Sequence, residues 1–151
     1  MDRRDALRSL GAAAVAAAAM PSLAQEEHHH HDSGVKNQAL INAASECVNK
    51  AEICQSHSQE LLAQGDKSMA HCAKNSRQIV VVCAALRSLA AQDAPSLPKF
   101  ANVAAAEVLS CEAGCHKGTG EHQACKKHQA CKDCADACAA CRAECAKIAV
   151  A

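Results

Sequence analysis

Small and apolar side chains recur at alternating steps of three and four residues along four stretches of the chain. These stretches cover residues 40–61, 69–90, 97–115 and 131–148. Such spacing keeps the side chains on one face of a helix, where they pack against neighbouring helices. No stretch alternates between apolar and polar residues for long enough to indicate a strand. The pattern therefore predicts an all-α protein.

Helix-breaking residues separate the four stretches. Gly65 and Asp66 lie between the first and second, the proline-containing segment 93–98 between the second and third, and the glycine-containing segment 118–120 between the third and fourth. Connections this short are typical of antiparallel neighbours in a bundle. We therefore expect an antiparallel up-down four-helix bundle over residues 35–151.

The predicted inward faces are rich in cysteine. Of the 12 cysteines in the chain, the spacing places all but Cys125 on these faces. In the fourth stretch, cysteines occupy nearly every inward position. The predicted bundle core is therefore lined with thiols. The inward set is Cys47, Cys54, Cys72, Cys83, Cys111, Cys115, Cys131, Cys134, Cys138, Cys141 and Cys145.

Composition supports a helical core without large side chains. The chain has one Phe, no Trp and no Tyr, so aromatic rings contribute little to its core, whereas its many alanines favour helix. Lys and Arg total 16, as do Asp and Glu, which gives no sign of a nucleic-acid or anionic-membrane partner. We recognise no nucleophile–base pair and no phosphate-binding loop, so we do not expect an enzyme.

The first 24 residues have the features of an export signal. Arg3 and Arg4 begin a basic region, and the apolar run 10–19 is too short to span a bilayer. The paired arginines resemble a twin-arginine signal, although an ordinary secretory signal would lead to the same compartment. We expect a signal peptide over 1–24, a periplasmic mature chain without a membrane span, and a flexible segment over 25–34. That segment holds four consecutive histidines, for which disorder and transient metal binding are both open.

Three roles are open to so many inward thiols. Packing alone explains one or two of them, because Leu or Ile would bury more apolar area at the same position. Disulfides within one helix are disfavoured because Cβ atoms four residues apart are about 5–6 Å apart, whereas a disulfide needs about 3.5–4.5 Å. Bridges between helices stay open. The third role is metal binding.

The spacing of the thiols favours a soft monovalent metal. The pairs Cys111–Cys115, Cys134–Cys138 and Cys141–Cys145 each place two sulfurs one helical turn apart, and such ligands select Cu(I). Closely packed thiols cannot all ionise in a buried core, but one Cu(I) for each thiolate leaves the assembly neutral. Sequestration of zinc, cadmium or mercury is the alternative. A thiol redox protein is less favoured, because no Cys-x-x-Cys lies in a βαβ context.

The segment His128–Cys145 resembles the last helix of the cysteine-rich four-helix-bundle copper storage proteins, and the export signal is similar to that of their exported branch. The resemblance extends over residues 35–151. It implies storage of Cu(I) ions inside the bundle, with the Cys-x3-Cys pairs as principal sites, and a homotetramer. Copper donor and acceptor proteins are the partners that this reading implies.

Distance from the connections predicts which cysteines share a layer of the bundle and where copper enters. The expected layers are Cys47 with Cys83 and Cys138, Cys54 with Cys131, and Cys72 with Cys111 and Cys125. At one end of the bundle, we expect an entry site for copper with Met69 and His122 as ligands. A row at three-residue intervals along the fourth helix would lead inward from it. This row is His122, Cys125, His128 and Cys131.

Overall fold

The computed structural model describes residues 34–117 and 125–149, which are all-helical and contain no strand. The predicted signal peptide and nearly all of the predicted His-rich segment lie outside them. The helices are α1 (Gln38–Ala63), α2 (Ala70–Ala91), α3 (Leu97–Lys117) and α4 (Gln129–Ile148). Two short 3-10 turns, η2 (Lys67–Met69) and η4 (Cys125–Lys127), precede α2 and α4. The all-α prediction is confirmed for this part of the chain.

Local sequence explains where the first helices end. Gly65 follows α1 with a φ of 97°, a backbone conformation that glycine adopts without steric cost. Asp66 then accepts a hydrogen bond from the backbone N–H of Ser68 at 3.0 Å, which caps η2. Pro98 lies in the first turn of α3, where its missing N–H is tolerated. The predicted breaks after the first and second helices are therefore confirmed, and the predicted break at 118–120 lies outside the described residues.

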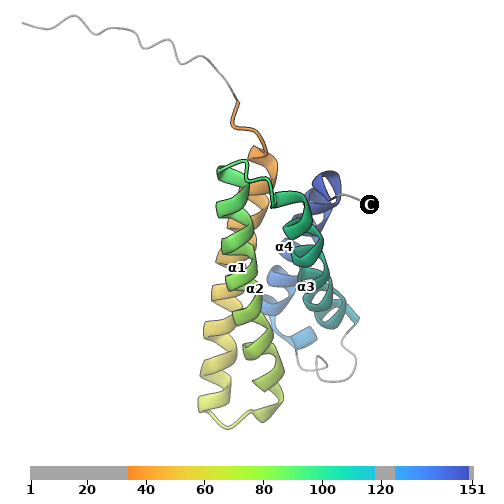
Figure 1. The fold of residues 1–151 in the computed structure, drawn as a ribbon. Coiled ribbons are helices and arrows are strands. Elements are labelled where there is room, and N and C mark those ends of the chain that lie inside the picture. Colours follow the sequence, from red (N-terminus) through yellow and green to blue (C-terminus); the bar gives the residue numbers. More distant parts are fainter. Residues whose placement is uncertain (1–33, 118–124, 150–151) are drawn as a thin grey trace, which may run out of the picture. The chain divides into compact units, whose positions relative to one another are not determined.

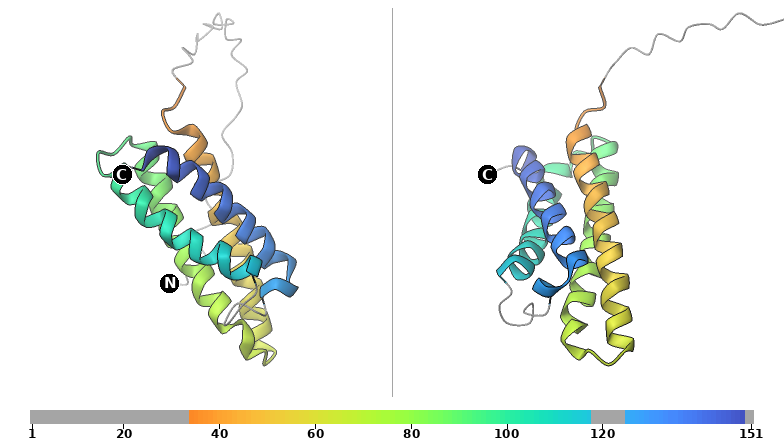
Figure 2. Two further views of the ribbon diagram at one scale, coloured as in Figure 1. Left: turned by 90° about the vertical axis from the view of Figure 1, so that its right-hand side faces the viewer. Right: turned by 180° about the vertical axis from the view of Figure 1, so that it is seen from behind.

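The four helices pack as a bundle. Figures 1 and 2 show α1 beside α2 and α3 beside α4, and α1 also packs against α4. The contact between α2 and α3 is the smallest of the four helix pairings. Arg142 on α4 forms a bidentate ion pair with Glu112 on α3, with Nε–Oε2 at 2.7 Å and a second N–O distance of 3.1 Å. None of the described helices is both long and apolar enough to cross a membrane.

The core consists mainly of cysteine and alanine. Its few large side chains are fully buried, and the predicted inward faces of the helices are the ones that line it. None of the fully buried core residues that the structure describes is aromatic. The largest fully buried side chains are Leu40, Met69, Ile79, Leu86 and Val108.

The start of α4 differs from the prediction. The helix begins at Gln129, after the η4 turn, and His128 is extended with φ −108° and ψ 127°. The prediction that Cys125, His128 and Cys131 form a row along one helix is therefore wrong. The count failed because a 3-10 turn and an extended residue rotate the chain differently from an α-helix. Met69 likewise lies in η2 rather than in α2, although it is fully buried.

A candidate metal centre of buried thiols

All twelve cysteines are buried and none is in a disulfide. Eleven lie on the inward faces as predicted. The prediction that Cys125 falls off these faces is wrong, because the η4 turn brings its side chain into the core, where it is 0% exposed. The sequence signal missed it because the heptad count assumed an uninterrupted helix.

Three helices contribute one sulfur each to a tight triangle. The Sγ atom of Cys54 on α1 lies 3.5 Å from that of Cys72 on α2 and 3.5 Å from that of Cys131 on α4. The Cys72–Cys131 separation closes the triangle at 3.3 Å. These separations far exceed a covalent S–S bond of about 2.05 Å. We call this set the lower triad.

Two further groups of three have Sγ atoms that all lie within 4.8 Å of one another. A middle group contains Cys111, Cys134 and Cys138, with 3.9 Å between the sulfurs of Cys111 and Cys134. The upper triad is Cys47, Cys83 and Cys141.

The three groups are connected rather than isolated. The sulfur of Cys138 in the middle group lies 3.5 Å from that of Cys47 in the upper triad. Cys54 of the lower triad interacts with Cys134 of the middle group. The thiols therefore form one continuous column through the bundle. An ion bound in one group would share sulfur ligands with an ion in the next group, or would lie beside it.

The remaining three cysteines extend this column. The thiols of Cys115 and Cys125 are close enough to Cys72 to shift its pKa, and the thiol of Cys145 shifts the pKa of Cys141. Every predicted cysteine ligand in the sequence thus has another thiol as a neighbour.

The predicted layers are confirmed in part. Cys72 was expected in a layer apart from Cys54 and Cys131, but the structure places all three in one triad. Cys141 also joins Cys47 and Cys83, which was not predicted. Cys47 lies with Cys83 and Cys138, as expected. Cys54 lies with Cys131, and Cys125 with Cys72. The expected neighbour of Cys72 on α3 was wrong, because Cys115 takes that place and Cys111 joins the middle group. The error is one helical turn, which is the separation within a Cys-x3-Cys pair.

The close thiols strongly perturb one another's ionisation. The pKa values of Cys138 and Cys115 are both raised. The largest cause in each case is hydrogen bonding with Cys111, followed by hydrogen bonding with other thiols and by burial. Cys72 is the opposite case, because Cys115 and three other thiols stabilise its thiolate by hydrogen bonding and lower its pKa. The column therefore favours a few thiolates among many neutral thiols.

Two histidines close to lower-triad cysteines in the sequence contact each other. Nε2 of His57 on α1 and Nδ1 of His128 are 2.9 Å apart, and both rings are partly buried. Each histidine is three residues from a lower-triad cysteine, Cys54 or Cys131. Met69 is buried in the turn before α2. The predicted ligand His122 lies outside the described residues.

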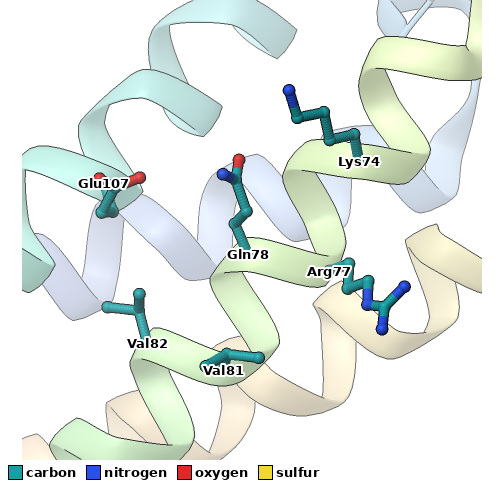
Figure 3. A pocket seen from close by; sticks show the side chains of 6 residues that line it. All are labelled: Lys74, Arg77, Gln78, Val81, Val82 and Glu107. Carbon is teal, nitrogen blue, oxygen red and sulfur yellow. The ribbon is translucent and has the colours of Figure 1, made fainter.

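A surface hollow lies away from the cysteine column. It has a volume of about 350 Å³ and lies between α2 and α3. Figure 3 shows that Glu107 comes from α3 and the other lining side chains from α2. Its lining contains neither a thiol nor an imidazole, so it is separate from the cysteine column. The lining residues are Lys74, Arg77, Gln78, Val81, Val82 and Glu107.

The buried cysteine groups can hold metal ions, because each offers three soft sulfur ligands at short mutual distances. No protein-family model matches this chain, and no curated protein matches it significantly. The arrangement of the thiols therefore carries the functional argument.

Proposed function

We propose that this protein binds and stores several Cu(I) ions in the thiol column and so buffers or supplies copper. One observation carries the proposal: all twelve cysteines are buried, and nine of them form three groups of three sulfurs that are joined into one column. A catalytic or structural site needs one such group, whereas a store uses many. Thiolates are the ligands that Cu(I) prefers.

Coordination number and charge favour Cu(I) over zinc. Each described group has three sulfurs, whereas structural zinc sites are almost always four-coordinate. A zinc ion with four thiolates also leaves two negative charges in the core, where burying charge is costly. One Cu(I) for each thiolate is neutral, and its binding displaces one proton from each thiol.

We expect the reduced protein to prefer Cu(I) to Zn(II) and to bind about one Cu(I) per cysteine. The measurement is titration of the reduced protein with each metal in the presence of a competing chelator of known affinity. Tight binding of many Cu(I) equivalents supports storage. Preference for zinc, with only a few equivalents bound, contradicts it and favours general sequestration of zinc, cadmium or mercury.

The remaining parts of the proposal concern the setting of the protein. The sulfur pairings support an antiparallel up-down order, because rising numbers on α1 (Cys47, Cys54) meet falling numbers on α4 (Cys138, Cys131). Export by the twin-arginine route to the periplasm and assembly into a homotetramer remain expectations from the sequence. We assign no catalytic activity.

Copper is proposed to enter at the end of the column that carries His57 and His128. These histidines contact each other, and each is three residues along the chain from a lower-triad cysteine. Met69 in the turn before α2 supplies a thioether, which binds Cu(I) without losing a proton. Asp66 in the α1–α2 connection interacts electrostatically with His128, which places that connection at the same end.

Replacing Met69 by Leu and His122 by Ala should slow copper uptake and release with little loss of final capacity. Leu conserves the apolar volume of Met69, so the variant removes ligands rather than packing. Stopped-flow transfer from a Cu(I)–chelator complex measures the rate. Phe100→Leu on α3 is the control, since it changes a partly buried apolar side chain without removing a ligand. A sharp fall in capacity at an unchanged rate would mean that Met69 and His122 are storage ligands and that copper enters elsewhere.

A further inference from the structure

The shape of the lower triad determines which ions can bind all three of its sulfurs. Its edges of 3.5, 3.5 and 3.3 Å make a nearly equilateral triangle. Dividing the mean edge by the square root of three puts each sulfur about 2.0 Å from the centre, which is shorter than the ~2.3 Å of a zinc–sulfur bond. An atom with bonds of that length therefore sits about 1.2 Å out of the sulfur plane. The triangle thus favours pyramidal over planar coordination.

We propose that Cys54, Cys72 and Cys131 form a binding site for trivalent arsenic, taken up as arsenous acid. Arsenic(III) keeps a lone pair and therefore binds three sulfurs on one of its sides, as a pyramid. The three sulfurs of the triangle already lie close enough together to bind one side of an arsenic atom, so no thiol has to move across the bundle. Because each sulfur comes from a different helix and is fully or almost fully buried, the set is held in place before the ligand arrives.

The reaction needs no oxidant or reductant. Three S–H bonds and three As–OH bonds break, three As–S bonds form, and three water molecules leave. Arsenic remains trivalent throughout. The thiol protons depart in the water, so the core gains no charge. Cu(I) differs here, because each Cu(I) ion that replaces a thiol proton releases that proton to solvent.

The lower triad is the first site that arsenic is expected to fill. All three of its edges are 3.5 Å or shorter. In the middle group, two of the three sulfurs come from α4 one turn apart, and the Cys111–Cys134 edge is 3.9 Å. A wider triangle must contract before it can bind all three sulfurs of one pyramid. That movement costs packing energy in a close-packed core.

The test uses the reduced full-length chain with sodium arsenite. We expect the first equivalent to consume three free thiols, as counted with a thiol reagent, and to add the mass of one arsenic less three hydrogens in native mass spectrometry. Arsenic X-ray absorption should show three sulfur neighbours and no oxygen. Two sulfurs with a retained oxygen, or no binding while all twelve thiols are reduced, would overturn the proposal.

Variants identify which sulfurs bind. Cys72→Ala should weaken the first binding constant by at least about tenfold, and Cys72→Ser serves the same purpose if the alanine variant does not fold. Cys145→Ala is the matched control, since Cys145 is equally buried and belongs to none of the three groups. Equal loss in both variants, or none in Cys72→Ser, contradicts the assignment.

This inference needs only reduced thiols and does not rest on copper storage. The two proposals therefore fail separately. A chain that binds many Cu(I) ions but takes up no arsenic leaves copper storage intact. A chain that binds one arsenic at the lower triad but prefers Zn(II) to Cu(I) leaves the arsenic site intact.

Discussion

Replacement of Cys134, Cys138, Cys141 and Cys145 together by alanine is expected to remove at least four Cu(I) equivalents and leave a helical protein. These four side chains are a third of the twelve thiols. Their loss also breaks two of the three groups, because the middle group loses two sulfurs and the upper triad loses one. Ions that bridge those groups also lose sulfur ligands, so the number of Cu(I) equivalents lost can exceed four. Chelator competition measures the capacity.

The helical fold should survive this change. Removing a buried sulfur costs about 1 kcal/mol of folding free energy at each site, and alanine offsets part of this through its higher helix propensity. Far-UV circular dichroism checks the helix content. The double variant Ile79→Ala with Val108→Ala is the control, because it opens the core without removing a thiol. It should lose stability and keep full copper capacity. Unchanged capacity in the quadruple variant would mean that α4 is not the store.

Much of the bundle was predictable because its cysteines repeat with the period of a helix face. Three- and four-residue steps identify the inward side of each helix without any knowledge of its neighbours. The layers followed from distance along each helix, which is why Cys47 with Cys83 was predicted correctly. Helix spacing, however, leaves an uncertainty of one turn between partners. That uncertainty exchanged Cys111 for Cys115 beside Cys72.

The departures arise where the backbone is not an α-helix. Cys125 lies in a 3-10 turn and His128 is extended, so periodicity carries no information about which way their side chains face. The shape of the lower triad was also beyond the sequence. It depends on how far apart α1, α2 and α4 lie, and small side chains in the core allow that spacing to vary. The proposed identity of the metal rests on ligand chemistry rather than on helix periodicity or on the spacing of the helices.

The metal-free, reduced protein is expected to lose stability steeply as the pH rises above about 9, whereas the copper-loaded protein is not. Hydrogen bonding with neighbouring thiols and burial hold the pKa of Cys138 and of Cys115 above the ordinary value of 9.0. Below that value, both the folded and the unfolded chain keep these protons. Above it, the unfolded chain releases protons that the bundle retains. The unfolded state then binds fewer protons, so the free energy of unfolding falls with pH.

Each such thiol contributes a slope of about −1.4 kcal/mol per pH unit above the ordinary thiol pKa. Cys72, whose pKa is lowered, acts in the opposite direction only below about pH 9, because above it the thiolate is favoured in both states. Since the chain has no tyrosine, phenol ionisation does not obscure the effect. Denaturant unfolding of the reduced protein between pH 7 and pH 10.5, roughly spanning the thiol range, measures it.

Copper should abolish this alkaline instability. Once a thiol has lost its proton to a Cu(I) ion, the folded state has none left to retain, so the difference in bound protons disappears. The metal-free variant with Cys115 and Cys138 replaced by alanine is the matched test. It should fall less steeply than the wild type, by about 1.4 kcal/mol per pH unit for each thiol removed. A metal-free wild type whose stability stays flat to pH 10.5 would show that the bundle does not hold these thiols neutral. The thiolates would then be available to metal ions without displacing protons.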